Sequence, residues 1–318
     1  MIEANHISKR FGVIEAVKDV SFTIDKGEVV GFLGPNGAGK TTTMRILACF
    51  FPPTSGSVKI NGLDVTRHSL QVRQLIGYSL EKAALYPDMR VLPFLRFVGE
   101  VKGLSGPELK KAVSEVVNRC GLEFMERRII KNLSRGYQQR LTLAQALIHH
   151  PDVLILDEPT AGLDPENISE IRQLIKSFAG ERTIILSSHV LSEVSMICGK
   201  VMIMDNGRIV AVDTPKNLGL LLQEGQIVDV RIEGPAHRVA EGLEKIDGVR
   251  RVQQLETDTG AQHLCAFRLE SEAERDILPA LNGLACQNNW VLREMVPVSM
   301  TLEEIFFTIL HNKRTRPQ

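Results

Sequence analysis

Apolar residues along the first part of the chain fall into short strand-like runs with helical stretches between them. Val20, Phe22 and Ile24 alternate with polar neighbours, which predicts a strand with one buried face. Other runs are almost continuously apolar, as in strands covered on both faces, and they span residues 28–34, 152–158, 183–189 and 200–205. Helical spacing follows the first three of these runs. Strands that alternate with helices predict a parallel sheet and an α/β fold.

Two further patterns lie within this first region. Residues 2–11 and 18–28 are strand-like, and Asn61-Gly62 separates two short strand-like pieces, as in a tight hairpin turn. These segments predict an antiparallel β subdomain. From about residue 85 to residue 150 the apolar spacing is helical, which predicts a helical subdomain.

The pattern changes after residue 219. Strand-like and helical segments now follow in the order βαββαβ, over residues 226–234, 235–246, 249–256, 263–270, 271–287 and 289–298. This order predicts a small ferredoxin-like α+β domain over residues 220–318, after a first domain over residues 1–219. One more short helix is expected at residues 301–310.

Composition limits the classes of partner and compartment. Lysine plus arginine and aspartate plus glutamate both number 38 among 318 residues, so no excess charge favours nucleic acid as a partner. The five cysteines form no C-x-x-C pair, which indicates reduced thiols in a cytosolic protein rather than disulfides or a metal site. No apolar run approaches the roughly 18 residues that cross a bilayer, so a membrane channel is expected to be another chain.

The stretch GPNGAGKTT follows an apolar strand and precedes a helical stretch. It matches the phosphate-binding pattern G-x-x-x-x-G-K-[ST] in the context that this pattern needs. Its glycines let backbone N–H groups face phosphates, Lys40 is expected to reach the β- and γ-phosphates, and the Thr41 hydroxyl is expected to bind Mg²⁺. The residues expected to contact the nucleotide here are Gly34, Pro35, Asn36, Gly37, Ala38, Gly39, Lys40, Thr41 and Thr42.

Two acids end the apolar strand VLILDE. Asp157 fits the role of holding Mg²⁺, while Glu158 is expected to point elsewhere and to polarise an attacking water. The alternative is a pair of solvated acids that cap a strand. Ligand sites lie at the carboxyl ends of strands in parallel sheets, which favours the functional interpretation.

The stretch LSRGYQQR predicts a second turn that opens a helix. Ser134 can cap a helix that begins near Gly136, and Gly136 lets the turn approach a ligand closely. Leu141, Ala144 and Leu147 then form an apolar helical stripe. The helix N-terminus offers N–H donors for a second anion contact. Taken alone, this turn is more typical of an ordinary helix cap.

Five signals in one order carry a resemblance to a known family. They are the P-loop, Leu-Ser-Xaa-Gly, the acidic strand end, AGLD and a strand that ends in SSH. Residues 1–219 resemble the ATP-binding subunits of ABC transporters. The resemblance implies an ATPase that works as a head-to-tail dimer, with ATP between the P-loop of one copy and the Leu-Ser-Xaa-Gly turn of the other. Finer features, among them IGYSLE and TLEEIFFTIL, are similar to the type-2 exporter subfamily and to gliding-motility-type subunits.

The resemblance also implies roles for single residues. Phe11 stands where the family stacks an aromatic ring on adenine. His189 corresponds to the histidine that contacts the γ-phosphate, and it joins Lys40 and Glu158 as a catalytic residue. Asp164 lies in the loop that communicates across the dimer. Taken alone, Phe11 is more typical of a core phenylalanine and His189 of a structural histidine, while Asp164 also suits a helix cap ahead of Pro165, a role that is compatible with communication across the dimer.

Two departures from the family pattern carry information. Glu81 stands where many members have glutamine, and a carboxylate there can also bind Mg²⁺. The usual LSGGQ is replaced by a version with Arg135 and Tyr137, in which Ser134 and Gly136 are kept. The resemblance therefore still implies hydrolysis of ATP.

The implied function is ATP hydrolysis that drives a separate integral-membrane permease, from the cytoplasmic face of the cell membrane. The working unit is expected to be a homodimer that binds ATP and Mg²⁺. Residues 82–104 stand where the family contacts its permease, although their apolar residues equally suit the core of the helical subdomain. Two alternatives stay open: a soluble ABC-type ATPase without a transport role, and a regulatory subunit that binds ATP without hydrolysing it.

Overall fold

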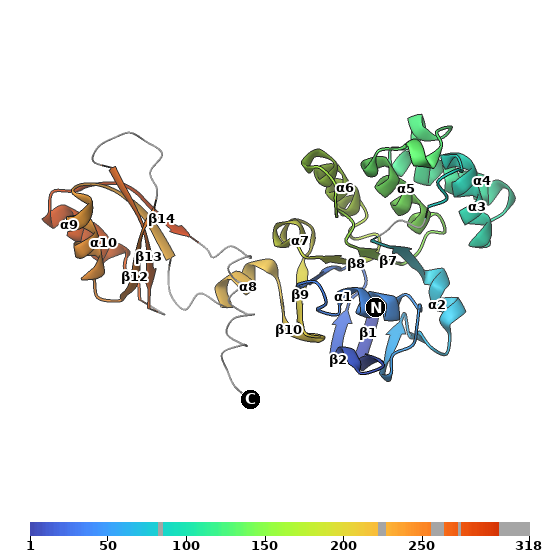
Figure 1. The fold of residues 1–318 in the computed structure, drawn as a ribbon, viewed down its shortest axis with the longest axis horizontal. Helices are drawn as coiled ribbons and strands as arrows, with labels where there is room; N and C mark the ends of the chain where they lie inside the picture. The colour runs from blue at the N-terminus through green and yellow to red at the C-terminus, as the bar shows by residue number, and fades with distance from the viewer. Residues whose placement is uncertain (82–84, 222–226, 256–263, 273–274, 299–318) are drawn as a thin grey trace. The chain divides into compact units, whose positions relative to one another are not determined.

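A computed structural model of the chain describes residues 1–81, 85–221, 227–255, 264–272 and 275–298 (Figure 1). It divides into two compact units, Met1–Pro215 and Lys216–Gln318. This division falls a few residues before the boundary predicted after residue 219, because most of α8 (Pro215–Leu221) groups with the second unit. The helix expected at residues 301–310 lies outside the described residues.

A six-stranded sheet forms the centre of the first unit, in the order β10-β9-β3-β8-β7-β6. Its strands are β3 (Val29–Leu33), β6 (Ile76–Ser79), β7 (Val153–Asp157), β8 (Thr183–Ser188), β9 (Lys200–Asp205) and β10 (Arg208–Asp213). Neighbouring strands are parallel except β10 and β9. Every residue of β3 and β7 is buried, as their apolar sequences predict. The predicted α/β fold is confirmed.

Helices cover both faces of this sheet. α1 (Lys40–Leu47) lies between one face and a second, antiparallel sheet, whereas α6 (Pro165–Ser177) and α7 (Leu191–Ile197) lie on the opposite face (Figure 1). The antiparallel sheet has the order β2-β1-β4-β5, with β1 (Ile2–Phe11), β2 (Ile14–Ile24), β4 (Ser55–Ile60) and β5 (Leu63–Asp64). Asn61 and Gly62 have left-handed φ angles of 48° and 81°, so they form the predicted hairpin turn.

Helices occupy most of the chain between β6 and β7. They are α3 (Val91–Val101), α4 (Gly106–Arg119) and α5 (Arg135–Leu147), with short 3-10 turns at Glu123–Met125 and Ile130–Asn132. Inward-facing residues of α4 recur every three or four positions, as in Leu109, Val113 and Val117. This region corresponds to the predicted helical subdomain. α2 (Ser69–Leu75) and β6 precede it, and the sequence patterns above do not predict either element.

The second unit has the order β11-α9-β12-β13-α10-β14. Its elements are β11 (Ile227–Glu233), α9 (Ala236–Glu244), β12 (Val249–Leu255), β13 (Leu264–Ser271), α10 (Leu278–Gln287) and β14 (Val291–Val298). The strands pair antiparallel in the order β12-β13-β11-β14, and both helices share one apolar core with them. This order of elements is that of a ferredoxin-like sandwich.

The second helix of this unit is shorter than the sequence predicts. It was expected over residues 271–287, but Ser271 is still paired in β13 and the helix begins at Leu278. Buried residues with helical spacing start at Ile277 and continue at Leu281 and Ala285. An apolar stripe, which a packed helix needs, is therefore present only from Ile277 onward.

His149 follows α5 and contacts both the helical subdomain and the central sheet. Its Nε2 lies 3.0 Å from the carbonyl oxygen of Ile76 and 3.3 Å from Lys102 Nζ. Burial, and then the charge of Lys102, lower the pKa of His149 from 6.5 to about 4. As the pH falls through this range, the unfolded chain therefore binds a proton here before the folded chain does, and the folded state loses stability.

We expect acidification from pH 7 to pH 5 to lower the free energy of unfolding by about 2 kcal/mol through His149. His149→Gln keeps an N–H that can donate to Ile76 but binds no proton. Its free energy of unfolding should therefore fall by about 2 kcal/mol less than that of the parent between pH 7 and pH 5. Urea unfolding at the two pH values measures the difference. His68→Gln, at an exposed histidine, is the control, and equal losses in all three proteins would contradict the assignment.

Candidate functional site

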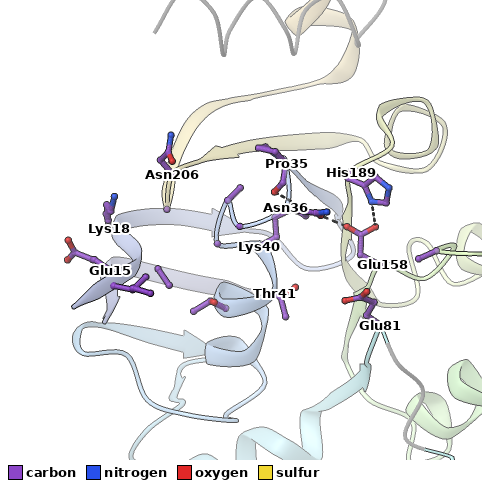
Figure 2. A pocket seen from close by; sticks show the side chains of 18 residues that line it. Glu15, Lys18, Pro35, Asn36, Lys40, Thr41, Glu81, Glu158, His189 and Asn206 are labelled. Atoms are coloured by element: carbon purple, nitrogen blue, oxygen red, sulfur yellow. Dashed lines mark hydrogen bonds and ion pairs between the residues drawn. The ribbon is translucent and has the colours of Figure 1, made fainter. Parts of the chain in front are cut away.

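A cavity of about 600 Å³ lies where the glycine-rich loop leaves β3 and α1 begins (Figure 2). The predicted loop residues from Pro35 to Thr42 line it. Glu81, Glu158 and His189, which are far apart in the sequence, line it as well. They meet because β6, β7 and β8 are adjacent parallel strands whose carboxyl ends lie at one edge of the sheet.

The loop needs glycine at positions where the backbone is crowded. Gly39 has a φ of 103°, and a Cβ there would lie 2.6 Å from the carbonyl oxygen of Ala16. A Cβ at Gly34 would overlap the carbonyl oxygen of Met204. These close approaches hold the loop against β2 and β9. The first N–H groups of α1 have no partner within the helix, so the loop and the helix N-terminus together suit an anion.

Lys40 is buried at the start of α1, with only 6% of its surface exposed. Its Nζ donates to the carbonyl oxygens of Gly34 and Pro35 at 2.7 and 3.3 Å. The same nitrogen lies 3.6 Å from Glu158 Oε1. The ammonium group is therefore held in the loop by carbonyl groups and faces the acid across the cavity (Figure 2).

Glu158 points into the cavity because its backbone is left-handed. It has a φ of 48°, which is uncommon for a residue other than glycine. Its N–H donates to Ser187 Oγ at 2.9 Å, which holds the turn to β8. The carboxylate is only 11% exposed, and His189 Nδ1 lies 2.8 Å from its Oε2, at hydrogen-bonding distance (Figure 2). Glu158 thus contacts Lys40 and His189, whereas Asp157 contacts Thr41 and Ser187.

Asp157 is the last residue of β7; it does not line the cavity but contacts Thr41, which does. Its Oδ1 accepts from Thr41 Oγ1 at 3.1 Å and from Ser187 Oγ at 2.6 Å. Burial raises the pKa of Asp157, and the charges of Glu158 and Glu81 add to the effect, while the two hydroxyls oppose it. A cation close to this carboxylate would relieve the clustering of negative charge. Ser187 was not predicted as a site residue, although SSH immediately precedes the loop after β8.

The donors in this part of the site fit Mg²⁺. Thr41, Asp157 and Glu81 offer one hydroxyl and two carboxylates, and Mg²⁺ prefers oxygen ligands. Among the described residues, no group of three or more histidine, cysteine, aspartate or glutamate side chains could hold a metal ion. Mg²⁺ usually binds through one or two carboxylates together with phosphate oxygens and water, so Thr41, Asp157 and Glu81 suit a Mg²⁺ that accompanies a nucleotide.

The far wall of the cavity consists of residues that the sequence interpretation missed. Glu15 and Lys18 of β2 and Asn206 of the β9–β10 turn lie there (Figure 2). The Asn206-Gly207 pair is visible in the sequence as a hairpin signal. Its place beside the loop depends on a long-range contact, in which Lys18 N donates to the carbonyl oxygen of Gly207 at 2.8 Å.

Known proteins are similar to this chain in sequence and in fold. The pattern of the family described as ABC transporter matches residues 17–161. The linearmycin resistance ATP-binding protein LnrL of Bacillus subtilis is 34% identical over 235 residues, which cover 74% of this chain and 76% of LnrL. The chain belongs to the ABC transporter ATP-binding proteins.

Further similarities extend over most of the first unit of this ABC subunit. The ABC transporter ATP-binding protein NatA of Bacillus subtilis is 38% identical and covers 66% of this chain and 88% of its own length. A dimeric structure of the ATP-binding cassette MJ0796, in a post-hydrolysis state bound to ADP and Pi, matches with a TM-score of 0.62 and 27% identity. That match covers 67% of this chain and 98% of MJ0796. The chain is thus an ATP-hydrolysing subunit of an ABC transporter.

Phe11 of the ABC subunit lies beside the cavity rather than in its lining. The ring is 47% exposed and contacts Phe51 edge-on, with 5.4 Å between ring centroids. Ile14, which pairs with Phe11 across the β1–β2 turn, does line the cavity. Phe11 is therefore an exposed residue next to one that lines the cavity.

The Ser134–Gly136 turn of the ABC subunit is also absent from the cavity lining. Ser134 caps α5, as predicted, and its Oγ accepts from Tyr137 N at 3.4 Å. Gly136 was expected to let the turn approach a ligand. In this chain a Cβ at Gly136 would overlap the side chain of Asn167 in α6, so the close approach is between two helices.

Asp164 of the ABC subunit caps α6 ahead of Pro165. Its carboxylate accepts from Asn167 N at 3.0 Å and from Asn167 Nδ2 at 2.7 Å. These hydrogen bonds lower the pKa of Asp164. Asp164 does not line the cavity, although Ala161 of the same loop does.

None of the helices in the described residues combines the length and the apolar composition that a membrane span requires.

Proposed function

We propose that two copies of this chain bind two ATP molecules between them and drive a separate membrane permease of the exporter class. The observation that carries the dimer is the separation of its motifs: Lys40, Glu158 and His189 share one cavity, whereas the Ser134–Gly136 turn lies outside it. The exporter class is supported by relatives named for linearmycin resistance and for bacitracin transport. The chain would act at the cytoplasmic face of the cell membrane.

The cavity suits a triphosphate in one orientation. Backbone N–H groups between Asn36 and Thr42 and the ammonium of Lys40 would hold the phosphates, and Phe11 would stack on adenine. Thr41, Asp157 and Glu81 would hold Mg²⁺, which neutralises phosphate charge when it is bound. Lys40 Nζ lies 3.6 Å from Glu158 Oε1. With ATP bound, the same ammonium group would also interact with the phosphates.

We infer that Glu158 acts as the general base, because it lies in the cavity between Lys40 and His189. A water molecule that enters between Glu158 and the γ-phosphate would lose a proton to the carboxylate as its oxygen attacks phosphorus. The bond between phosphorus and the bridging oxygen of ADP then breaks. His189, 2.8 Å from Glu158 Oε2, would orient the carboxylate and contact the γ-phosphate with its other ring nitrogen.

The second copy would complete the site. Ser134 Oγ and the N–H groups at Gly136 would contact the γ-phosphate in the partner's cavity, and Asp164 would lie at the dimer interface. The permease would contact the surface of residues 82–104. In the described part of that segment, Tyr86, Phe97 and Val101 expose 52%, 40% and 69% of their surface, so these side chains are not buried in the core of the chain and are available to a partner.

Ser134→Arg tests whether the turn acts on the partner's nucleotide. The larger arginine side chain would fill the space between the turn and the γ-phosphate bound to the partner, and so prevent their contact. Hydrolysis measured by phosphate release should then fall at least about tenfold. ATP binding by single chains, measured by calorimetry, should not change. Ser105→Arg is the matched control, because Ser105 is the exposed residue that precedes α4. If Ser134→Arg abolishes ATP binding by single chains, the turn acts within its own chain.

A further inference from the structure

Arg135 connects the Ser134–Gly136 turn to the loop that follows β7. It is the first residue of α5, and its Nη1 donates to the carbonyl oxygen of Gly162 at 3.1 Å. Gly162 has a φ of 71°, and a Cβ there would lie 3.2 Å from the same nitrogen. The glycine thus leaves room for the guanidinium group. The usual family turn has glycine at position 135 and could not make this contact.

A second contact joins the same two segments. Gly136 lies directly against the side chain of Asn167, which a Cβ would overlap. Asn167 in turn donates to both carboxylate oxygens of Asp164, at 3.0 and 2.7 Å. The turn is therefore fixed to the start of α6 through packing and to the preceding loop through Arg135.

The loop is fixed to the catalytic residues at its other end. Ala161 N donates to the carbonyl oxygen of Glu158 at 3.1 Å, and Ala161 itself lines the ATP cavity. Thr160 is buried and its hydroxyl donates to the buried carboxylate of Glu193 in α7. A shift of Gly162 would accordingly be transmitted over a few residues to Glu158, whose left-handed backbone sets the direction of its side chain.

We propose that Arg135 is a positioning residue that couples the two ATP sites of the dimer. The inference rests on the proposed function, in which the Ser134–Gly136 turn of one chain contacts the ATP of its partner. When ATP bound to the partner contacts the Ser134–Gly136 turn and shifts it, Arg135 shifts Gly162 in the same chain. Glu158 of that chain then aligns with the ATP bound to its own P-loop. Occupancy of one site thereby promotes hydrolysis in the other.

Arg135→Gly removes the link and keeps the backbone of the turn. For the parent chain we expect a Hill coefficient for ATP hydrolysis that approaches about 2, the number of sites in the dimer. Arg135→Gly should lower it to about 1 and reduce kcat about fivefold, with ATP binding by single chains unchanged. Arg135→Lys keeps a long cationic donor and should restore most of the cooperativity, which a loss of folding could not explain.

Gly162→Ala changes the other residue of the contact between Arg135 and Gly162. The added Cβ would lie 3.2 Å from Arg135 Nη1 at a residue with a left-handed φ of 71°, so this variant displaces the loop and should also lose cooperativity. If both variants act through the same contact, the double variant should lose no more than either single one. An unchanged Hill coefficient in Arg135→Gly, or a parent that hydrolyses without cooperativity, would overturn the coupling. A raised KM for ATP at an unchanged Hill coefficient would instead place the guanidinium on the nucleotide.

These outcomes separate the inference from the proposed function. The dimer itself is tested by ATP-dependent association of Glu158→Gln on size-exclusion chromatography. If that dimer forms while Arg135→Gly stays cooperative, the dimer stands and the coupling role is wrong. If no dimer forms, the proposed function fails first, and the role of Arg135 fails with it.

Discussion

Glu158→Gln is expected to reduce ATP turnover at least about a hundredfold, because a general base contributes that much or more to proton transfer. The amide has the same shape as the carboxylate, and the hydrogen bond from the N–H of residue 158 to Ser187 Oγ does not involve the side chain that is changed. The variant should therefore fold and bind ATP. It also removes a negative charge that faces the phosphates, so ATP should hold two copies together.

Phosphate release measures the turnover of this variant, and size-exclusion chromatography with and without ATP measures its association. Glu108→Gln is the control, since Glu108 is exposed in the first turn of α4 and does not line the cavity. It should retain the parental rate. A Glu158→Gln variant that hydrolyses ATP at the parental rate would contradict the assignment of Glu158 as the base.

The sequence predicts those parts of the site that depend on local order. GPNGAGKTT forms a loop between β3 and α1 because its glycines permit close backbone approaches. Asp157 ends a fully buried strand, so its carboxylate has to lie at the edge of the sheet. The caps at Ser134 and Asp164 are also local, since each accepts from an N–H three residues ahead.

Other parts of the site depend on segments that are distant in sequence. Ser187 bridges Asp157 Oδ1 and Glu158 N, and it can do so only because β8 pairs with β7. The pairing of Lys40 with Glu158 joins α1 to the end of β7. Helical and strand periodicity contains no information on such contacts. The same limit applies to β6, four residues whose strand conformation comes from pairing with β7.

Lys40→Ala is expected to weaken ATP binding at least about a hundredfold, through two effects. The first is the loss of charge-assisted hydrogen bonds from a buried ammonium to phosphate. The second is specific to this cavity: Lys40 Nζ lies 3.6 Å from Glu158 Oε1, so removal of the lysine leaves that carboxylate to repel the phosphates. Both effects act in a low-dielectric site, since 6% of Lys40 is exposed.

The two effects can be separated by a double variant. Lys40→Ala with Glu158→Gln lacks the repelling charge, so it should bind ATP about tenfold more tightly than Lys40→Ala alone. Calorimetry measures the affinities, and Lys18→Ala, at the far wall, is the control with a much smaller expected loss (Figure 2). Equal affinities of the single and double variants would mean that Glu158 does not face the phosphates. Parental affinity in Lys40→Ala would mean that the triphosphate binds elsewhere. The carbonyl oxygens of Gly34 and Pro35 hold the Lys40 ammonium inside the loop, so an anion bound in the loop interacts with it.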